Sequence, residues 1–400
     1  MKNISFSPPD ITTNEKNRIS EVLNSGWITT GPTVKRFESR LAKYCGTQNT
    51  VCLNSATAGL ELILRVLGIS DGDEVITSAY TYTASASIIA HTGAKIVLAD
   101  TKNNSYEMDY DKLSSLITPK TKAIIAVDIA GVICDYNKLF NIVNYKKSCF
   151  VANNPYQEAI GRICVIADAA HSFGATQDDK ISGSIADFSV FSFHAVKNLT
   201  TAEGGAITWN KALPFDTEAL YKEFMLLALH GQDKDALTKS QAGAWEYDIK
   251  CLGYKYNMTD IAAGIGIAQL SRYPYFLAER HTIIKQYNNA FAGTNIEFLA
   301  HVGENYRSSG HLYLTRITNI KEEKRNKFIQ KMAEDGIATN VHYKPLPLFT
   351  AYKNLGFDIK DFPNAFNQYQ NQISLPLHTK LSADDITYII ENYIKAVKEV

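Results

Sequence analysis

Between residues 51 and 210, short apolar runs alternate with segments of helical pattern, and this alternation constrains the fold more than any other feature of the chain. Near-continuous apolar runs are typical of strands buried on both faces of a parallel sheet. The pattern therefore predicts an α/β fold with a mainly parallel sheet that helices cover on both sides. The predicted strands span residues 51–53, 74–77, 95–99, 123–128, 162–167 and 188–193.

The pattern changes after residue 210, where helices are predicted over 213–229 and 259–291. A small α+β unit should follow, with strands near 307–317 and 338–343 and a last helix over 383–397. A chain of 400 residues favours two domains. We expect a large domain over residues 1–265, and a connecting helix with a smaller domain over 266–400. The polar, turn-rich segment 146–161 is interpreted as an inserted surface loop.

Charge and composition limit the partners that this chain can have. Its 41 basic and 41 acidic residues cancel, which argues against a polybasic surface for nucleic acid or membranes. No apolar run reaches the length of a signal sequence or a membrane span, so the expected location is the cytoplasm. The six cysteines form no CxxC pair and have no zinc-finger spacing, so we expect reduced thiols and no metal site.

Ligands of parallel α/β sheets bind beyond the carboxyl ends of the strands, so residues there are the candidates for function. Lys197 lies in a loop after the apolar run 188–193, where its amine could react with a carbonyl carbon. Asp168 ends another buried run, and a carboxylate there is costly unless it is paired. It could cap a helix, or it could hold the proton on a pyridine nitrogen.

Two further segments follow strands of the same predicted sheet. The segment 54–60 opens a helix with small and hydroxyl residues, an arrangement that suits a phosphate group but also serves as an ordinary helix cap. Tyr82 follows the second strand, where an aromatic ring could stack on a planar ligand or simply fill the core. Together, the four features indicate one crevice with an amine, a carboxylate, a stacking ring and a phosphate site.

These segments resemble the DegT/StrS family of nucleotide-sugar aminotransferases. These enzymes use pyridoxal 5'-phosphate (PLP) and have the type I fold of aspartate aminotransferase. The resemblance implies a large domain with a mainly parallel seven-stranded sheet and a smaller C-terminal α+β domain. The motifs that carry it lie along nearly the whole chain, at residues 26–32, 72–76, 168–171, 192–197, 203–205, 336–337, 342–343 and 375–377.

The resemblance also implies roles for single residues. Lys197 would form the Schiff base with PLP, and Asp168 would pair with the pyridine nitrogen. His171 would lie near the phenolic oxygen or the stacked face of the ring, which completes a predicted catalytic set with the other two. The remaining cofactor contacts that the resemblance implies are Ala56, Thr57 and Ser192 at the phosphate, Tyr82 on the ring, and Lys255.

Lys255 is the main departure from the family pattern. Relatives often have Gly-x-Asn-x-Arg before the long helix, and the Asn reaches the phosphate in a neighbouring subunit. Here the segment 253–257 reads Gly-Tyr-Lys-Tyr-Asn, so Lys255 occupies the Asn position. A lysine could serve a phosphate as a point charge. The family resemblance further implies a homodimer with shared active sites.

The implied reaction moves an amino group from glutamate to a keto-deoxyhexose of a nucleoside diphosphate sugar. The expected acceptor is a UDP- or dTDP-linked 4-keto-6-deoxyhexose, and the product would serve surface polysaccharide or glycan synthesis. Alternatives are a PLP enzyme of the same fold that acts on a cyclitol or a 3-keto sugar, and a non-catalytic regulator. The chain shows no DNA-binding unit that a regulator would need.

Substrate contacts are expected in the N-terminal loop and near the end of the chain. Trp27 could instead only pack between domains, and His342 could be a satisfied core histidine. His194 is expected to face the site without a readable role, and His311 to be structural or adjacent to substrate. The predicted substrate contacts are Trp27, Thr29, Gly31, His342 and Tyr343.

Overall fold

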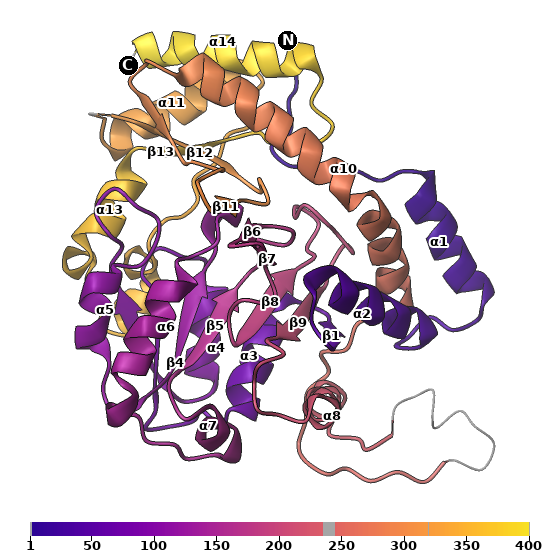
Figure 1. Ribbon diagram of the computed structural model, residues 1–400. Helices are drawn as coiled ribbons and strands as arrows, with labels where there is room; N and C mark the ends of the chain where they lie inside the picture. Colours follow the sequence, from indigo (N-terminus) through magenta and orange to yellow (C-terminus); the bar gives the residue numbers. More distant parts are fainter. Residues whose placement is uncertain (1, 235–244, 319, 400) are drawn as a thin grey trace.

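A computed structural model describes residues 2–234, 245–318 and 320–399 of the chain (Figure 1). Its centre is a seven-stranded sheet in which β9 runs antiparallel to both of its neighbours and the other neighbouring strands pair in parallel. This architecture confirms the predicted mainly parallel sheet. Across the sheet the strands are β1 (Thr50–Leu53), β9 (Gly205–Trp209), β8 (Phe188–Ser192), β5 (Cys164–Asp168), β4 (Thr121–Val127), β2 (Glu74–Ser78) and β3 (Lys95–Ala99).

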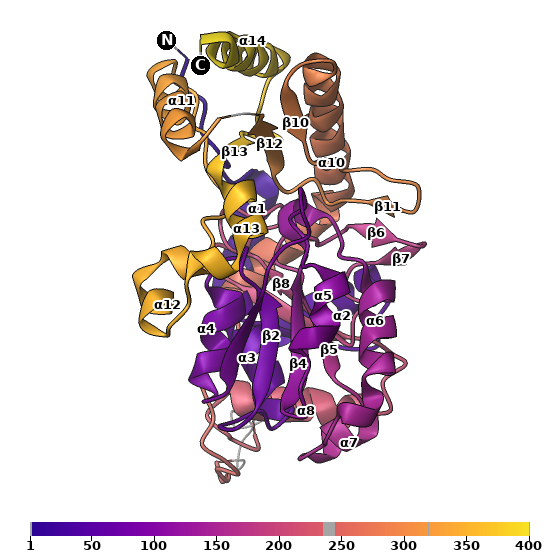
Figure 2. The same ribbon diagram turned by 90° about the vertical axis from the view of Figure 1, so that its left-hand side faces the viewer.

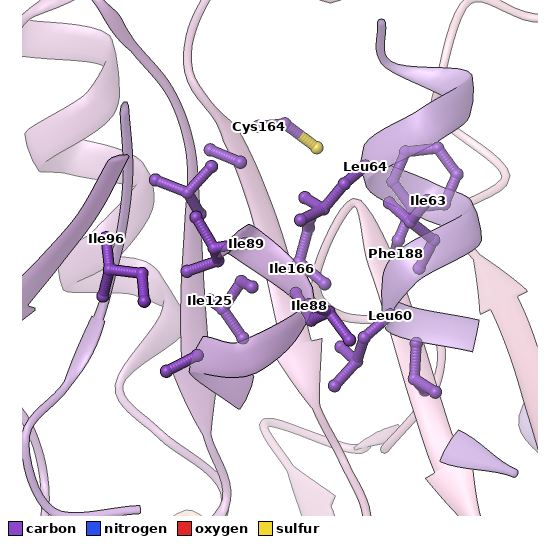
Figure 3. Close-up of a cluster of buried hydrophobic side chains, with 14 of the residues drawn as sticks. Leu60, Ile63, Leu64, Ile88, Ile89, Ile96, Ile125, Cys164, Ile166 and Phe188 are labelled. Carbon is purple, nitrogen blue, oxygen red and sulfur yellow. The ribbon is translucent and has the colours of Figure 1, made fainter. Parts of the chain in front are cut away.

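Helices cover both faces of this sheet (Figure 2). One face carries α3 (Ala56–Val66), α4 (Ala84–His91) and α8 (Thr217–Ala228). The other carries α2 (Pro32–Cys45), α5 (Tyr110–Leu116), α6 (Tyr136–Tyr145) and the start of α10 (Asp260–Phe291). Figure 3 shows part of the core on the face that carries α3, α4 and α8. There the α3 residues Leu60, Ile63 and Leu64 face the sheet residues Ile125, Ile166 and Phe188. Full burial of each such side chain contributes about 1.5–3 kcal/mol.

The C-terminal unit contains a three-stranded antiparallel sheet in the order β10-β12-β13. A separate apolar core lies between this sheet and its helices. The elements of this unit are β10 (Ile296–Phe298), β11 (Tyr306–Arg307), β12 (Tyr313–Ile317), α11 (Glu322–Glu334), α12 (Thr350–Asn354), α13 (Pro363–Gln370), β13 (Gln372–Leu375) and α14 (Ala383–Glu399). β11 pairs with β6 (Thr176–Gln177) of the large unit, which also pairs with β7 (Lys180–Ile181).

The 32-residue helix α10 belongs to both units (Figure 1). Its first half, with Ile267 and Tyr273, packs in the second core of the large unit alongside α2. Its second half, with Ile283 and Tyr287, packs in the core of the C-terminal unit. The boundary predicted after residue 265 falls within this helix and remains a prediction.

The N-terminal segment runs from the C-terminal unit to the large one. Ile4 packs in the C-terminal core and pairs with Ile337 through a single bridge. The chain then reaches α1 (Thr13–Asn24), which packs against α10. Asp10 forms an ion pair with Arg272 of α10, with 2.8 Å between Oδ1 and Nη2. The first residues therefore lie with the C-terminal unit, although the sequence assigned them to the large domain.

Three predicted elements differ from the structure. Residues 338–343 form no strand, because their only β pairing is a single bridge between Asn340 and Ser374. The predicted strand 307–317 is divided into β11 and β12 around Gly310, whose φ of 62° interrupts the extended backbone. The segment 146–161 is no plain loop, because it contains α7 (Pro155–Ile160). Asn154 caps this helix by accepting hydrogen bonds from two of its backbone N–H groups.

In the described part of the chain, no helix is both long and apolar enough to cross a bilayer. The same residues contain no group of three or more histidine, cysteine or acidic side chains that could hold a metal ion. All six cysteines are free. Four of them are buried, Cys149 is exposed and Cys251 is partly exposed.

Candidate active site

A cavity of about 470 Å³ lies beyond the carboxyl ends of the central strands, where the C-terminal unit meets the sheet. This volume is within the usual range for sites that bind small molecules. The structure brings together in this cavity nine residues that the sequence proposed separately. They are Ala56, Thr57, Tyr82, Asp168, His171, Ser192, Lys197, His342 and Tyr343.

Asp168 lies at the end of β5 with its carboxylate buried beneath the cavity. Ser85 of α4 donates a hydrogen bond to its Oδ2 at 2.6 Å, and the backbone N–H of Ala170 donates to its Oδ1 at 3.2 Å. Burial raises the pKa of Asp168 above its ordinary value, while Ser85, Ala170 and the charge of Lys197 oppose that rise. A buried anion so placed can hold the proton on a ring nitrogen.

Lys197 lies in a turn that follows β8. Its backbone N–H donates a hydrogen bond to the carbonyl of His194 at 2.9 Å, which closes this turn. Its amine lines the cavity. Burial lowers the pKa of Lys197 to about 8, although the charge of Asp168 acts in the opposite direction. A substantial fraction of neutral amine is therefore present near pH 8, and a neutral amine is both a nucleophile and a base.

The N-terminus of α3 forms the anion-binding end of the cavity. Ser55 caps the helix by accepting a hydrogen bond from the N–H of Ala58 at 3.1 Å, and Ala56 and Thr57 follow in its first turn. The helix dipole and the free N–H groups of this turn favour a phosphate. Gly205 of β9 lies against it: a Cβ there would be 2.5 Å from the backbone nitrogen of Ala56.

Aromatic rings and histidines from both units form the rest of the wall. Tyr82 is 60% exposed, and its ring centroid is 6.0 Å from that of Tyr343. The Tyr343 hydroxyl is 3.0 Å from Nε2 of His171. The His311 ring lies 4.3 Å from the ring of His171. The N-terminal Phe6 also lines the cavity and stacks on His342 with 5.5 Å between centroids.

Four predicted site residues do not line the cavity that one chain forms. Trp27 donates from Nε1 to the carbonyl of Thr30 at 3.1 Å. The carbonyl of Thr29 accepts a hydrogen bond from the backbone N–H of Asp260, at the start of α10. The N–H of Gly31 donates to the carboxylate of the same residue. Lys255 is exposed, and its carbonyl accepts a hydrogen bond from Asn54, just before the cap of α3.

Sequence reasoning missed Ser85 and Phe6. Ser85 has no motif of its own, and only its position three residues after Tyr82 could have drawn attention to it. Phe6 precedes all the predicted elements. His194, which was expected to face the site, lies at the rim with Nε2 3.6 Å from Oε1 of Glu203.

The residues of this cavity fit PLP. They supply an amine, a buried carboxylate for a ring nitrogen, a helix N-terminus for a phosphate and an exposed aromatic ring that can stack. A mainly parallel sheet with such a crevice at the carboxyl ends of its strands fits a PLP-dependent enzyme of fold type I.

Comparison with known proteins agrees with that class. The model of the DegT/DnrJ/EryC1/StrS aminotransferase family matches residues 9–393, and the chain belongs to this family. The predictions of an aminotransferase and of PLP as its cofactor are thereby confirmed.

Three relatives illustrate the similarity. The PLP form of the putative sugar aminotransferase Spr1654 from Streptococcus pneumoniae is 53% identical, with a TM-score of 0.96 over 100% of this chain and 99% of that one. The Bacillus subtilis spore coat polysaccharide biosynthesis protein SpsC is 36% identical over 98% of this chain and 97% of its own length. Helicobacter pylori PseC, an aminotransferase of pseudoaminic acid biosynthesis, is 27% identical, with a TM-score of 0.87 over 100% of both chains.

Proposed function

We propose that the protein transfers an amino group from glutamate to a keto-deoxyhexose of a nucleoside diphosphate sugar. The acceptor is a UDP- or dTDP-linked 4-keto-6-deoxyhexose, and the product serves surface polysaccharide or glycan synthesis in the cytoplasm. Support comes from relatives that are named for sugar amination or for polysaccharide synthesis. The observation that carries the proposal is the Lys197 amine, with its lowered pKa, in one cavity with Asp168.

When bound, PLP supplies an electron sink for removal of a proton from the carbon that carries the amino group. The residues of this chain prepare that step. Asp168 keeps the ring nitrogen protonated, and the first turn of α3 holds the phosphate. The neutral Lys197 amine would take this proton and deliver it to the carbon of the cofactor that carried the aldehyde. His342 and Tyr343 face the substrate from the C-terminal unit.

The active form in this proposal is a homodimer with shared sites. In this proposal Trp27, Thr29 and Lys255 reach the cavity of the partner copy, which accounts for their positions outside the cavity of their own chain. Gly31 is buried and attaches their loop to Asp260. Exposed apolar side chains near these residues and at the cavity support such an interface: Ile28 is 50% exposed and Val196 is 41% exposed. Burial of such side chains favours association.

Mixed dimers test this arrangement. Lys197→Ala and Lys255→Ala are purified separately, each with low activity expected, then dissociated and combined. When equal amounts of the two variants recombine at random, about half of the dimers are mixed. Each mixed dimer with shared sites contains one complete site out of two, so activity should return to about a quarter of that of the wild type. No recovery despite mixed dimers, or a fully active monomer in sedimentation at assay concentration, would contradict the proposal.

A half-reaction tests the chemistry. Glutamate converts the PLP-loaded enzyme to its pyridoxamine form, and UDP-, dTDP- and GDP-linked keto-sugars and a keto-cyclitol are then added one by one. Return of the visible absorbance with a UDP- or dTDP-linked 4-keto sugar is the expected result. Return only with the cyclitol or a 3-keto sugar would identify the alternative acceptor, and no conversion by glutamate would refute the proposed donor.

A further inference from the structure

Two hydrogen bonds connect the backbone that follows β4 to a side chain of the cavity through His171. The donor of each bond can be assigned. The turn η1 (Ile129–Gly131) follows β4, and the N–H of Ala130 points at Nδ1 of His171 with 3.2 Å between the nitrogens. A backbone N–H can only donate. Nδ1 of His171 therefore carries a lone pair and no hydrogen.

The charge state of His171 determines the next bond. Burial, the charge of Lys197 and the neighbouring His342 lower the pKa of His171 well below its ordinary value, so the ring is neutral. A neutral imidazole has one N–H, which must then be on Nε2. Since Nε2 is 3.0 Å from the Tyr343 hydroxyl oxygen, His171 donates this bond and Tyr343 accepts it.

Tyr343 consequently cannot direct its own hydrogen at His171. In the described residues, His171 is the one hydrogen-bond partner of this hydroxyl, and Tyr343 lines the cavity. Burial and the charge of Asp168 raise the pKa of Tyr343 far above its ordinary value, so the hydroxyl keeps its hydrogen. That hydrogen is available to a bound molecule.

The turn that starts this series is held firmly in place. Ala130 has a φ of 58° and Gly131 a φ of 90°. The carbonyl of Ala130 accepts a hydrogen bond from the N–H of His311 at 3.1 Å, and that of Gly131 accepts one from Ser309 at 3.0 Å. A Cβ on Gly131 would be 2.0 Å from Oγ of Ser309. These hydrogen bonds and the close approach of Ser309 hold the left-handed backbone of this turn in place, as is common at functional sites.

We propose that Tyr343 is a catalytic hydrogen-bond donor to an anionic or carbonyl oxygen in the cavity, and that His171 is the positioning residue that fixes the direction of this bond. The oxygen belongs either to the ring of PLP or to the substrate. This inference rests on the proposed transamination, and it assigns to His171 a role through Tyr343 rather than direct proton transfer.

The variants Tyr343→Phe, His171→Gln and His171→Leu test the proposal. Loss of the Tyr343 hydroxyl should lower the rate of the glutamate half-reaction about 100- to 1,000-fold, as for loss of one directed donor. His171→Gln can still accept from Ala130 and donate to Tyr343, so it should retain more activity than His171→Leu. In the His171→Leu background, Tyr343→Phe should cost much less than in the wild type, because the two residues act as a unit.

Absorbance and kinetics distinguish the two oxygens. If the acceptor is the ring oxygen of PLP, Tyr343→Phe shifts the pH midpoint of the visible absorbance of the loaded enzyme before any substrate is added. If it is a substrate oxygen, that midpoint stays and kcat or KM for glutamate changes. Tyr393→Phe is the matched control: it removes a buried hydroxyl bonded to Thr315 in the C-terminal core and should change neither readout.

Two results would overturn the proposal: Tyr343→Phe with unchanged absorbance and kinetics, or losses from Tyr343→Phe and His171→Leu that are fully additive. Thermal unfolding of each variant shows whether the fold is retained, and His171→Gln supplies the comparison if His171→Leu fails to fold. Both readouts precede the sugar, so failure to find a sugar acceptor would refute the proposed function and leave this result standing.

Discussion

Burial of the Lys197 amine disfavours its charged form, and the neutral form that results is the one that the proposed reaction needs. An ordinary lysine is almost fully protonated near pH 8, whereas burial lowers the pKa of this one to about 8. We expect the rate of PLP incorporation into the apoenzyme to rise with pH through a midpoint near 8, because only the neutral amine attacks the aldehyde. Stopped-flow absorbance after mixing measures that rate.

Lys197→Ala is the control for this measurement, since it should give no visible band that borohydride can reduce. Modification of surface lysines by PLP would instead follow the ordinary lysine pKa of about 10.4. An incorporation midpoint above pH 10 would show that Lys197 is not held in the environment described.

Ser85 donates a hydrogen bond of 2.6 Å to Asp168 and thereby favours its charged form. Burial raises the pKa of Asp168 and Ser85 opposes it, so Ser85→Ala should raise that pKa further. The carboxylate would then be lost at a higher pH on acidification. We expect the acid limb of the pH profile of kcat to move up by about one to two pH units, since a hydrogen bond to a charged group contributes about 1.5–3 kcal/mol.

Ser87→Ala, two residues further along α4, is the matched control and should leave the acid limb in place. Ser85→Thr should restore it, because the hydroxyl is retained. An unshifted limb in Ser85→Ala would show that this hydrogen bond does not determine the ionisation of Asp168 during turnover.

Single residues were predictable from the sequence where a strand placed them. Lys197 and Asp168 follow apolar strands, and the alternation of strands with helices fixes which edge of the sheet they reach. Ser85 and Ala130 act through partners 83 and 41 residues away. Those pairings depend on how α4 and the turn η1 pack on β5, for which the sequence has no local pattern.

At the scale of elements, the approach of β9 to α3 determines the shape of the phosphate site. Gly205→Ala would place a methyl group 2.4 Å from the carbonyl carbon of Ser55, so the strand or the helix end must shift. We expect affinity for PLP to fall at least tenfold and the free energy of unfolding of the apoenzyme to fall by about 1–3 kcal/mol. Fluorescence titration with PLP and urea unfolding measure these effects.

Gly264→Ala is the control for added volume at a glycine. A Cβ there meets only the side chain of Val22 closely, at 3.2 Å, and alanine favours the helical conformation of α10. Both variants gain one methyl group, so an equal loss of PLP affinity in both would show that the β9–α3 contact has no special part in the phosphate site.

Elements were predictable where the apolar pattern is regular and less so near the cavity. Residues 338–343 have the composition of a strand, yet Ile337 and Asn340 each pair with a different partner, at one residue apiece. Instead of continuing as a strand, the backbone after Asn340 places His342 and Tyr343 in the cavity. The helix α7 did have a local signal, an Asn-Pro start and Gly161 at the end, which the interpretation of 146–161 as a loop overlooked.

At the scale of the whole molecule, the cavity depends on chain segments far apart in sequence. Its walls come from residues near both ends of the chain, including Phe6 and Tyr343, as well as from the strand ends of the large unit. The sequence pattern predicted six of the seven strands of the large sheet, all except β9. It did not predict that the N-terminal segment packs on the C-terminal unit, because the pairing of Ile4 with Ile337 spans almost the entire chain.

The helix α10 has a consequence for the thermodynamics of unfolding. Its two halves fill two different cores, so neither core can melt without exposing apolar side chains of a helix that the other core holds. Pro274 lies between the halves and removes one hydrogen bond, but the helix continues through it. We expect one cooperative transition in calorimetry of the apoenzyme, with equal calorimetric and van't Hoff enthalpies per cooperative unit. Two resolved transitions would mean that the shared helix does not couple the two units. A single transition would mean that the molecule unfolds as one cooperative unit, although its apolar side chains form three separate cores.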